Sequence, residues 1–236
     1  MVAVRGSHLL NPQNFVIEQW CAGLKLAEQT EKSLIDAWYY ARDLMNAYPD
    51  EMKNATLMLQ SGVEMVEILH ELNMDAETLL TAMLFPIVAN KLTDWESLKE
   101  KFGAKITKLL KGVLEMDNIR QLNASHSANA LQVDNVRRML LAMVDDFRCV
   151  IIKLAERITF LRDAEHRCAE EDKVLAVKEC SYIYAPLANR LGIGQLKWEL
   201  EDYCFRYLHP EQYRAIAKLL QERRLDREHY NEEKKS

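Results

Sequence analysis

The side chains that could bind a metal or act as nucleophiles are scattered through this chain. No histidine has another His or a Cys at metal-ligand spacing, so we expect surface positions for His8, His70, His126, His166, His209 and His229. An odd number of dispersed cysteines, with no CxxC pair, is typical of a reducing compartment. It predicts small, mostly buried thiols at Cys21, Cys149, Cys168, Cys180 and Cys204.

Charged residues offer further candidates. Asp145 and Asp146 could form an acid–base pair, but neighbours on a helix point about 100° apart, which favours helix-end or ion-pair roles. Phosphate or RNA could be bound by two basic groups, Arg137 with Arg138 and Arg223 with Arg224 and Arg227. Acidic residues interleave with the second group, so a solvated ion-pair face is the simpler interpretation. The net charge of −5 gives no overall attraction to nucleic acid.

The elements that must position these side chains are predicted to be helices. The chain is 49% hydrophobic, with only seven Gly and five Pro, which disfavours a turn-rich β fold. We predict an all-α fold, with Thr30 and Asp75 as N-caps and CVIIKLAERI as a central buried helix. Helices are expected over 14–27, 31–48, 63–72, 76 onward, 95–102, 105–122, 131–163, 174–190, 195–207 and 211–224. No apolar stretch has the length of a signal peptide or a membrane span, so we expect a cytoplasmic protein with no membrane contact.

One predicted helix contains an unexpected dipeptide. Residues 79–94 read LLTAMLFPIVANKLTD, and Phe85-Pro86 interrupts the apolar face of the helix. A proline inside a helix removes a backbone donor and clashes with the preceding turn, at a cost of about 3 kcal/mol. The position therefore requires an explanation.

Two stretches are specific enough to indicate a family. They are RCVIIKLAERITFLRD at 148–163 and IYAPLANRLGIGQLKWELEDYCFRYLHPEQY at 183–213. With DNVRRMLLAMVDDFR at 134–148, they make the chain resemble the N-terminal half of the RelA/SpoT enzymes, which make and degrade (p)ppGpp. The resemblance covers about residues 30–230. It implies an HD-type helical hydrolase domain over 1–165, followed by a helical connector over 166–236.

In bifunctional members of this family, the hydrolase removes the 3′-pyrophosphate of (p)ppGpp with a bound Mn²⁺. His and Asp ligands in the motifs ITHP, LLHDVVEDT and KLADR hold the ion, which activates a water, and a Glu–Asp pair in the second motif handles protons. The resemblance assigns these roles to positions that here hold Ser61, Phe85 and Pro86, Ala89 and Asn90, and Glu156. Only Glu156 retains a carboxylate.

These departures predict a pseudo-hydrolase. A hydroxyl, a phenyl ring and a proline cannot build an octahedral site, and a lone glutamate holds no divalent ion tightly, so we expect no Mn²⁺ or other cofactor. The family's nucleotide-contacting loop RKSG corresponds to residues 52–55, where only the lysine remains, and Phe160 replaces a family Asn. A residual nucleotide pocket would then depend on Lys53, Lys153, Arg157 and Arg162.

The resemblance implies a catalytically inactive, regulatory region of a (p)ppGpp synthetase (GTP pyrophosphokinase) of the stringent response. We expect the synthetase segment to lie outside this chain. In a longer protein, this chain would then control the synthetase domain, and by itself it would be no enzyme. Ribosome and tRNA contacts are implied only for regions further toward the C-terminus. Two alternatives stay open: a sensor of (p)ppGpp, GTP or GDP, and a residual metal phosphohydrolase that uses Glu156.

The connector over 174–224 carries the closest match to the family and no catalytic residue type. We expect the rings of Trp198 and Tyr203 to be buried in its core. In its last helix, Tyr213, Ile216, Ala217 and Leu220 have the spacing of a buried stripe.

Overall fold

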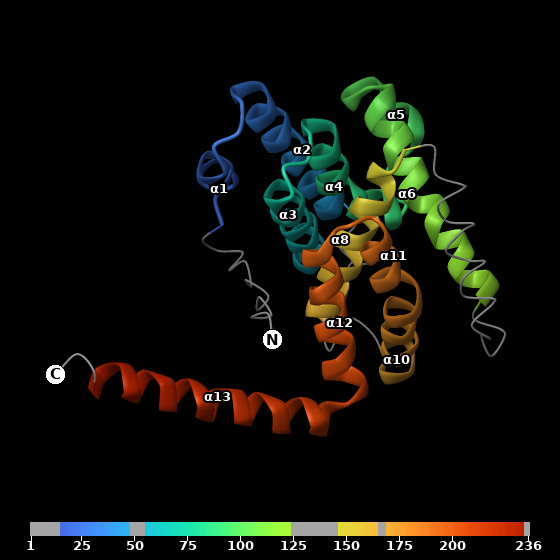
Figure 1. The fold of residues 1–236 in the computed structure, drawn as a ribbon. Helices are drawn as coiled ribbons and strands as arrows, with labels where there is room; N and C mark the ends of the chain where they lie inside the picture. Colours follow the sequence, from blue (N-terminus) through green and yellow to red (C-terminus); the bar gives the residue numbers. More distant parts are fainter. Residues whose placement is uncertain (1–14, 48–54, 124–145, 165–168, 234–236) are drawn as a thin grey trace.

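The computed structural model describes residues 15–47, 55–123, 146–164 and 169–233, and these residues are almost entirely helical (Figure 1). The helices are α1 (Ile17–Leu24), α2 (Glu28–Ala47), α3 (Ala55–Glu71), α4 (Ala76–Ala89), α5 (Trp95–Phe102), α6 (Ala104–Asn123), α8 (Arg148–Arg162), α10 (Glu170–Glu179), a π-helix η1 (Cys180–Tyr184), α11 (Ala185–Arg190), α12 (Gly194–Leu208) and α13 (Pro210–Glu233). No strand occurs in the described residues. The all-α prediction is confirmed.

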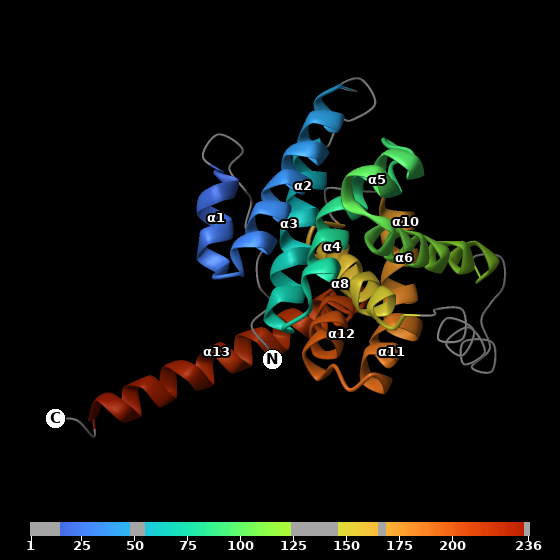
Figure 2. The same ribbon diagram turned by 90° about the horizontal axis from the view of Figure 1, so that it is seen from above.

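Helix α8 is the central element of the molecule. It packs against α3, α4, α6 and α12, and both ribbon views place it among these helices (Figures 1 and 2). Residues 149–155 are all buried, including one lysine, Lys153. A helix that is buried on all sides must be apolar or must pair its charges internally. The sequence prediction of a central buried helix is confirmed.

Helix α4 is the other helix that is buried along nearly its whole length. Its N-cap is Asp75, as predicted, and the Asp75 carboxylate accepts a hydrogen bond from the backbone N–H of Thr78 at 2.8 Å. The helix continues through Pro86 to Ala89, so the proline does not end it. At its C-terminal end, the side-chain amide of Asn90 donates to the carbonyl of Pro86 at 2.7 Å.

Two glycines allow close helix contacts around this core. A Cβ on Gly62 would lie 3.1 Å from the carbonyl oxygen of Met83, so glycine permits α3 to approach α4 closely. A Cβ on Gly112 would lie 2.7 Å from the Cys149 sulfur, so glycine likewise permits α6 to approach α8 closely. A larger residue at Gly62 would push α3 away from α4, and one at Gly112 would push α6 away from α8.

Several predicted helix boundaries were wrong. Helix α1 is shorter than 14–27 and ends at Lys25, which has a left-handed φ of 54°. Helix α2 begins at Glu28, so Thr30 is not its N-cap. The predicted helix 174–190 is interrupted by η1, in which the N–H of Ala185 donates to the carbonyl of Cys180. Pro186, which lacks an N–H, follows directly and removes a normal helical bond at this point.

The connector prediction is half right. Tyr203 is 2% exposed and packs in the core, but Trp198 is 56% exposed. The buried face of α12 consists of Leu196, Glu199, Leu200, Tyr203 and Cys204, which follow helical spacing. Trp198 lies off this stripe, so the prediction that its ring is buried in the connector was wrong.

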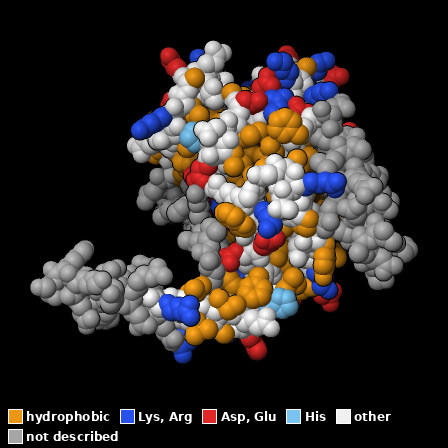
Figure 3. Space-filling model, in the orientation of Figure 1, with side chains coloured by type: hydrophobic (Ala, Val, Ile, Leu, Met, Phe, Trp, Pro, Cys, Tyr) orange, Lys and Arg blue, Asp and Glu red, His pale blue; other side chains and the backbone are white. Residues whose placement is uncertain are grey.

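Helix α13 extends away from the rest of the molecule (Figure 1). Its neighbour is α12, and hydrophobic side chains are visible along its described part (Figure 3). Ile216, Leu219 and Leu220 are between 41% and 60% exposed, so the prediction of a buried stripe at Ile216 and Leu220 was wrong for this chain.

The described cysteines agree with the sequence prediction. Cys21, Cys149, Cys180 and Cys204 are free and buried, whereas Cys168 lies outside the described residues. Burial raises the pKa of the Cys149 thiol to about 11, so this thiol stays protonated at neutral pH. Across the described ranges, no helix has the length and apolar character needed to cross a membrane.

Candidate functional site

The positions that the resemblance assigns to hydrolase chemistry lie on α3, α4 and α8. Ser61 of α3 is buried, and its hydroxyl is 3.1 Å from the hydroxyl of Thr159 on α8. Phe85 is only 4% exposed. Pro86 is also buried, while Ala89 and Asn90 are exposed at the end of α4. Lys53 lies outside the described residues.

Glu156, the one retained carboxylate, is paired with cations of its own helix. The ammonium of Lys153 lies 3.0 Å from its Oε2, and the Nε of Arg157 donates to the same oxygen at 2.6 Å. Lys153 is 1% exposed and Arg157 is 4% exposed, so the two cations are buried with it. Burial alone would raise the pKa of Glu156, but Arg157 and Lys153 outweigh it and hold that pKa well below its usual range. Glu156 is therefore an ionised carboxylate whose charge is already compensated.

Two aromatic rings cover this ion cluster. The Lys153 ammonium is 5.5 Å from the centroid of the Phe85 ring, and the Arg157 guanidinium is 5.0 Å from that of Phe160. Both distances are within the range of cation–π attraction. Phe85 and Phe160 stand where the resemblance assigns a metal-ligand His and a nucleotide-contacting Asn. Each now packs against a cation of α8.

The donor set does not suit a divalent metal. In the part of the chain that the structure describes, no three His, Cys, Asp or Glu side chains gather closely enough to hold an ion. A site for Mn²⁺ needs several imidazole or carboxylate ligands around one point. Here a single carboxylate faces two protein cations, which would repel a metal ion. The absence of bound Mn²⁺ stays a prediction.

The last residue expected to contact nucleotide, Arg162, is engaged in a different buried cluster. Its Nη2 donates to Oε1 of Glu199 on α12 at 2.6 Å, and its Nη1 lies 3.7 Å from Oε2 of Glu64 on α3. Burial would lower the pKa of Arg162, but the Glu199 carboxylate outweighs this and raises it. Lys153, Arg157 and Arg162 thus share one helix and each pairs with a carboxylate. One nitrogen of Arg157 is left over: its Nη1 is buried and has no protein hydrogen-bond partner.

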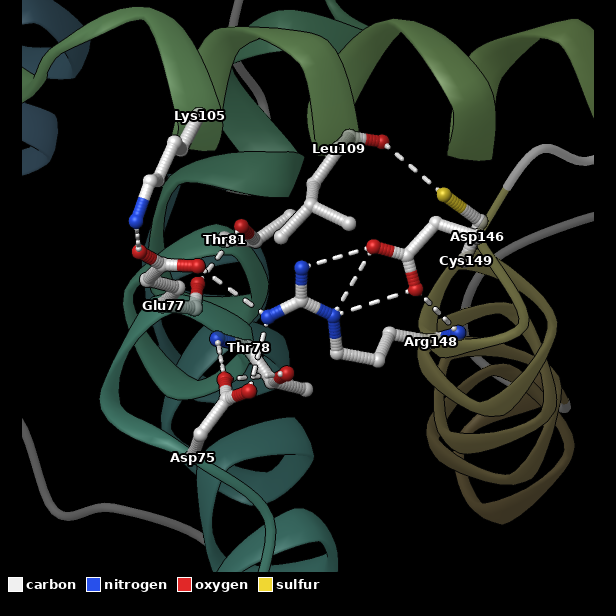
Figure 4. Close-up of polar contacts among 9 residues, drawn as sticks. All are labelled: Asp75, Glu77, Thr78, Thr81, Lys105, Leu109, Asp146, Arg148 and Cys149. Carbon is white, nitrogen blue, oxygen red and sulfur yellow. Dashed lines mark hydrogen bonds and ion pairs between the residues drawn. The ribbon is translucent and has the colours of Figure 1, made fainter.

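A third cluster, which the sequence analysis only partly foresaw, lies at the N-terminal end of α8 (Figure 4). Arg148 donates to both oxygens of Asp146, to Asp75 at 2.7 Å and to Glu77 at 3.1 Å. Glu77 also pairs with Lys105 of α6 at 3.1 Å. The expected ion-pair role of Asp146 is confirmed, while Asp145 lies outside the described residues. A single sequence does not predict the contact between Arg148 and Asp75, because these residues are 73 positions apart.

A surface groove of about 520 Å³ lies elsewhere, on α2 and α5. It is lined by Asp36, Tyr39, Tyr40, Asp43, Leu44 and Lys101. None of these residues belongs to the positions assigned to hydrolase or nucleotide chemistry. The groove is therefore separate from the candidate site.

Comparison with known proteins defines the class of this domain. Residues 37–194, more than half of the chain, match the family described as HD domain. The chain is 99% identical over 230 residues to a GTP pyrophosphokinase of Haemophilus influenzae, a match that covers 98% of this chain and 31% of that protein. It is 56% identical over 236 residues to a GTP pyrophosphokinase of Escherichia coli K12, covering 99% and 31% of the two chains.

A relative with a different name matches as well. The chain is 32% identical over 215 residues to a guanosine-3′,5′-bis(diphosphate) 3′-pyrophosphohydrolase of Aquifex aeolicus, covering 88% of this chain and 30% of that protein. This chain therefore belongs to the HD domain family and corresponds to the N-terminal region of the RelA/SpoT proteins. It spans about 30% of the length of these relatives. The predicted domain boundary at residue 165 falls inside the HD match and stays a prediction.

Proposed function

We propose that this HD domain is catalytically inactive and regulates a (p)ppGpp synthetase domain of the same longer protein. The observation that carries the proposal is the state of Glu156. Its carboxylate is bound by Lys153 and Arg157, and Phe85 lies over the lysine. A hydrolase of this family would need Glu156 free to bind a metal together with ligands from α3 and α4, and those positions hold a serine, a phenyl ring and a proline.

Hydrolysis is tested directly with the purified chain. We expect no Mn²⁺-dependent release of pyrophosphate from ppGpp, because no ligand set activates a water. The HD region of the Aquifex aeolicus relative, named a pyrophosphohydrolase, is the matched positive control. Pyrophosphate release by this chain that requires Mn²⁺ would contradict the proposal and favour the residual hydrolase.

Regulation is tested in the longer protein. The names of the relatives support GTP pyrophosphokinase activity for such a protein. We expect its rate of pyrophosphate transfer from ATP to GTP or GDP to change when residues 1–180 are deleted. An unchanged rate would leave this region without a regulatory role. Contacts with ribosome and tRNA through other regions, and a cytoplasmic location, belong to the same proposal.

A nucleotide sensor is the second candidate, and one observation favours it. The buried Nη1 of Arg157 has no protein partner and could bind an anionic oxygen. Against this, Arg162 and Lys153 are already paired with carboxylates. Calorimetry with ppGpp and with GTP distinguishes the candidates. Heat that is lost in Arg157→Lys would support the sensor, and no heat at millimolar ligand would exclude it.

A further inference from the structure

The C-terminal end of α8 contains a buried charged group that joins three helices. We call Glu64 of α3, Arg162 of α8 and Glu199 of α12 the Arg162 cluster. The three side chains are between 5% and 10% exposed, and one guanidinium lies between the two carboxylates. On α3, the amide of Gln60 donates to Glu64 at 2.8 Å, which holds that carboxylate from its own helix.

The cluster lies where the connector meets the rest of the domain. Helix α12 packs on α8, and the hydroxyl of Tyr207 on α12 donates to the carbonyl of Leu161, next to Arg162, at 3.1 Å. Polar contacts between α3 and α12 run through Arg162 and from the side-chain amide of Gln195 to Glu71 at 3.3 Å. Leu196, Leu200 and Tyr203 give α12 apolar packing in the core, and the Arg162 cluster adds a buried charged contact to this attachment.

The charged contact between α3, α8 and α12 depends on a single residue, Arg162. Buried ion pairs contribute little net stability, because desolvation opposes the Coulomb attraction, but they fix geometry and are costly to break. Here two carboxylates share one cation. If the guanidinium is removed, the attraction between α12 and the domain is replaced by repulsion between Glu64 and Glu199. Apolar contacts elsewhere on α12 would be unaffected.

We propose that Arg162 couples α12, and with it α13, to the HD domain, so that loss of this one charge loosens the packing of α12 on α8 while α4 stays folded. The coupling is a conformational device of the fold. Its regulatory meaning rests on the proposed function, because α12 and α13 belong to the predicted connector toward the synthetase domain. The coupling itself is a property of this chain and is tested without any nucleotide chemistry.

Hydrogen exchange of the 236-residue chain tests the coupling. In Arg162→Met we expect amide exchange in residues 194–208 to accelerate at least about tenfold, while exchange in residues 76–89 of α4 changes by less than about twofold. A general loss of stability would accelerate both segments alike. Equal acceleration of α4 and α12, or no change in α12, would overturn the proposal.

Three further variants keep the test decisive if Arg162→Met folds poorly. Glu199→Gln removes the carboxylate of α12 and should accelerate exchange in residues 194–208. Glu64→Gln leaves the Arg162–Glu199 pair intact and should leave α12 protected. Arg148→Met is the matched control, because it removes an arginine from the other end of α8 and should leave residues 194–208 unchanged. Acceleration of α12 by Glu64→Gln and not by Glu199→Gln would contradict the proposal.

Discussion

The two ends of helix α8 are each held by an arginine among carboxylates, but in different surroundings. At the N-terminal end, the Arg148 side chain is 22% exposed, and its partners Asp75, Glu77 and Asp146 are between 29% and 51% exposed. At the C-terminal end, Arg162 is 5% exposed, and its partners Glu64 and Glu199 are 5% and 10% exposed. The Glu156 cluster between them resembles the buried end.

This difference in burial predicts different contributions of the two arginine clusters to stability. Exposed pairs contribute about 0–1 kcal/mol, are weakened by salt and tolerate change. Buried pairs leave an uncompensated charge when one partner is removed, at a cost of about 3–5 kcal/mol. Substitutions in the middle and C-terminal parts of α8 should therefore cost more stability, and these parts carry Glu156 and the predicted nucleotide contacts Lys153, Arg157 and Arg162.

The largest effect is expected at the middle of the helix. Glu156→Ala leaves Lys153 and Arg157 buried without their carboxylate, and we expect the free energy of unfolding to fall by about 3–5 kcal/mol. Denaturant titration followed by circular dichroism measures this. Glu77→Ala, at the exposed end, should cost about 1 kcal/mol or less. Equal losses in the two variants would remove the distinction between buried and exposed clusters.

A matched pair of aromatic substitutions tests the packing of α12 against the C-terminal end of α8. Tyr203→Ala removes a buried ring and should lower the free energy of unfolding by about 3 kcal/mol. Trp198→Ala removes a ring that is 56% exposed and should cost about 1 kcal/mol or less. Thermal or chemical unfolding of both variants decides the question, and a larger loss in Trp198→Ala would refute the described orientation of α12.

The smallest effect is expected for Arg148→Met, with a loss of about 1 kcal/mol at low salt that shrinks at high salt. The hydrogen bond from Arg148 is the main cause that lowers the pKa of Asp146. For Asp75, burial opposes the shift, but bonds from Thr78 and Arg148 outweigh it and lower the pKa.

A carboxylate with a lowered pKa stabilises the fold above its unfolded pKa of about 3.9, and this contribution is lost as the pH falls through the folded value. The difference in the free energy of unfolding between wild type and Arg148→Met should therefore be largest near neutral pH and disappear in acid. Unfolding curves at several pH values measure it, and a difference that grows in acid would contradict the cluster.

The sequence predicted the helical class correctly, because that class depends on local pattern, whereas the loss of hydrolase chemistry rests on the family resemblance and stays a prediction. The apolar period identified α8 as buried, and Asp75 was predicted correctly as an N-cap. The π-helix at Cys180 was missed, because the apolar spacing of residues 174–190 predicts a helix without showing an interruption within it. The exposure of Trp198 was also missed, although its position off the stripe of Leu196, Leu200 and Tyr203 could have shown it.

The interior of the candidate site could not be predicted in the same way. The sequence marked Lys153, Arg157 and Arg162 as residual nucleotide contacts, since they are basic and lie close to lost ligand positions. The pairing of Lys153 and Arg157 with Glu156 is local to α8, and helical spacing favours the pair of Lys153 with Glu156. Only the tertiary packing shows that Arg162 is directed to Glu64 and Glu199. Two of these carboxylates come from α3 and α12, far from α8 in the sequence, and one sequence alone does not pair them.

The central claim is that compensation of Glu156 by Lys153 and Arg157 has replaced metal-dependent hydrolysis. The most direct test incubates the purified chain with ppGpp and Mn²⁺ and measures pyrophosphate release, with the HD region of the Aquifex aeolicus relative in parallel. The account predicts release by that relative and none by this chain above a metal-free blank. Mn²⁺-dependent release by this chain above the metal-free blank would contradict it.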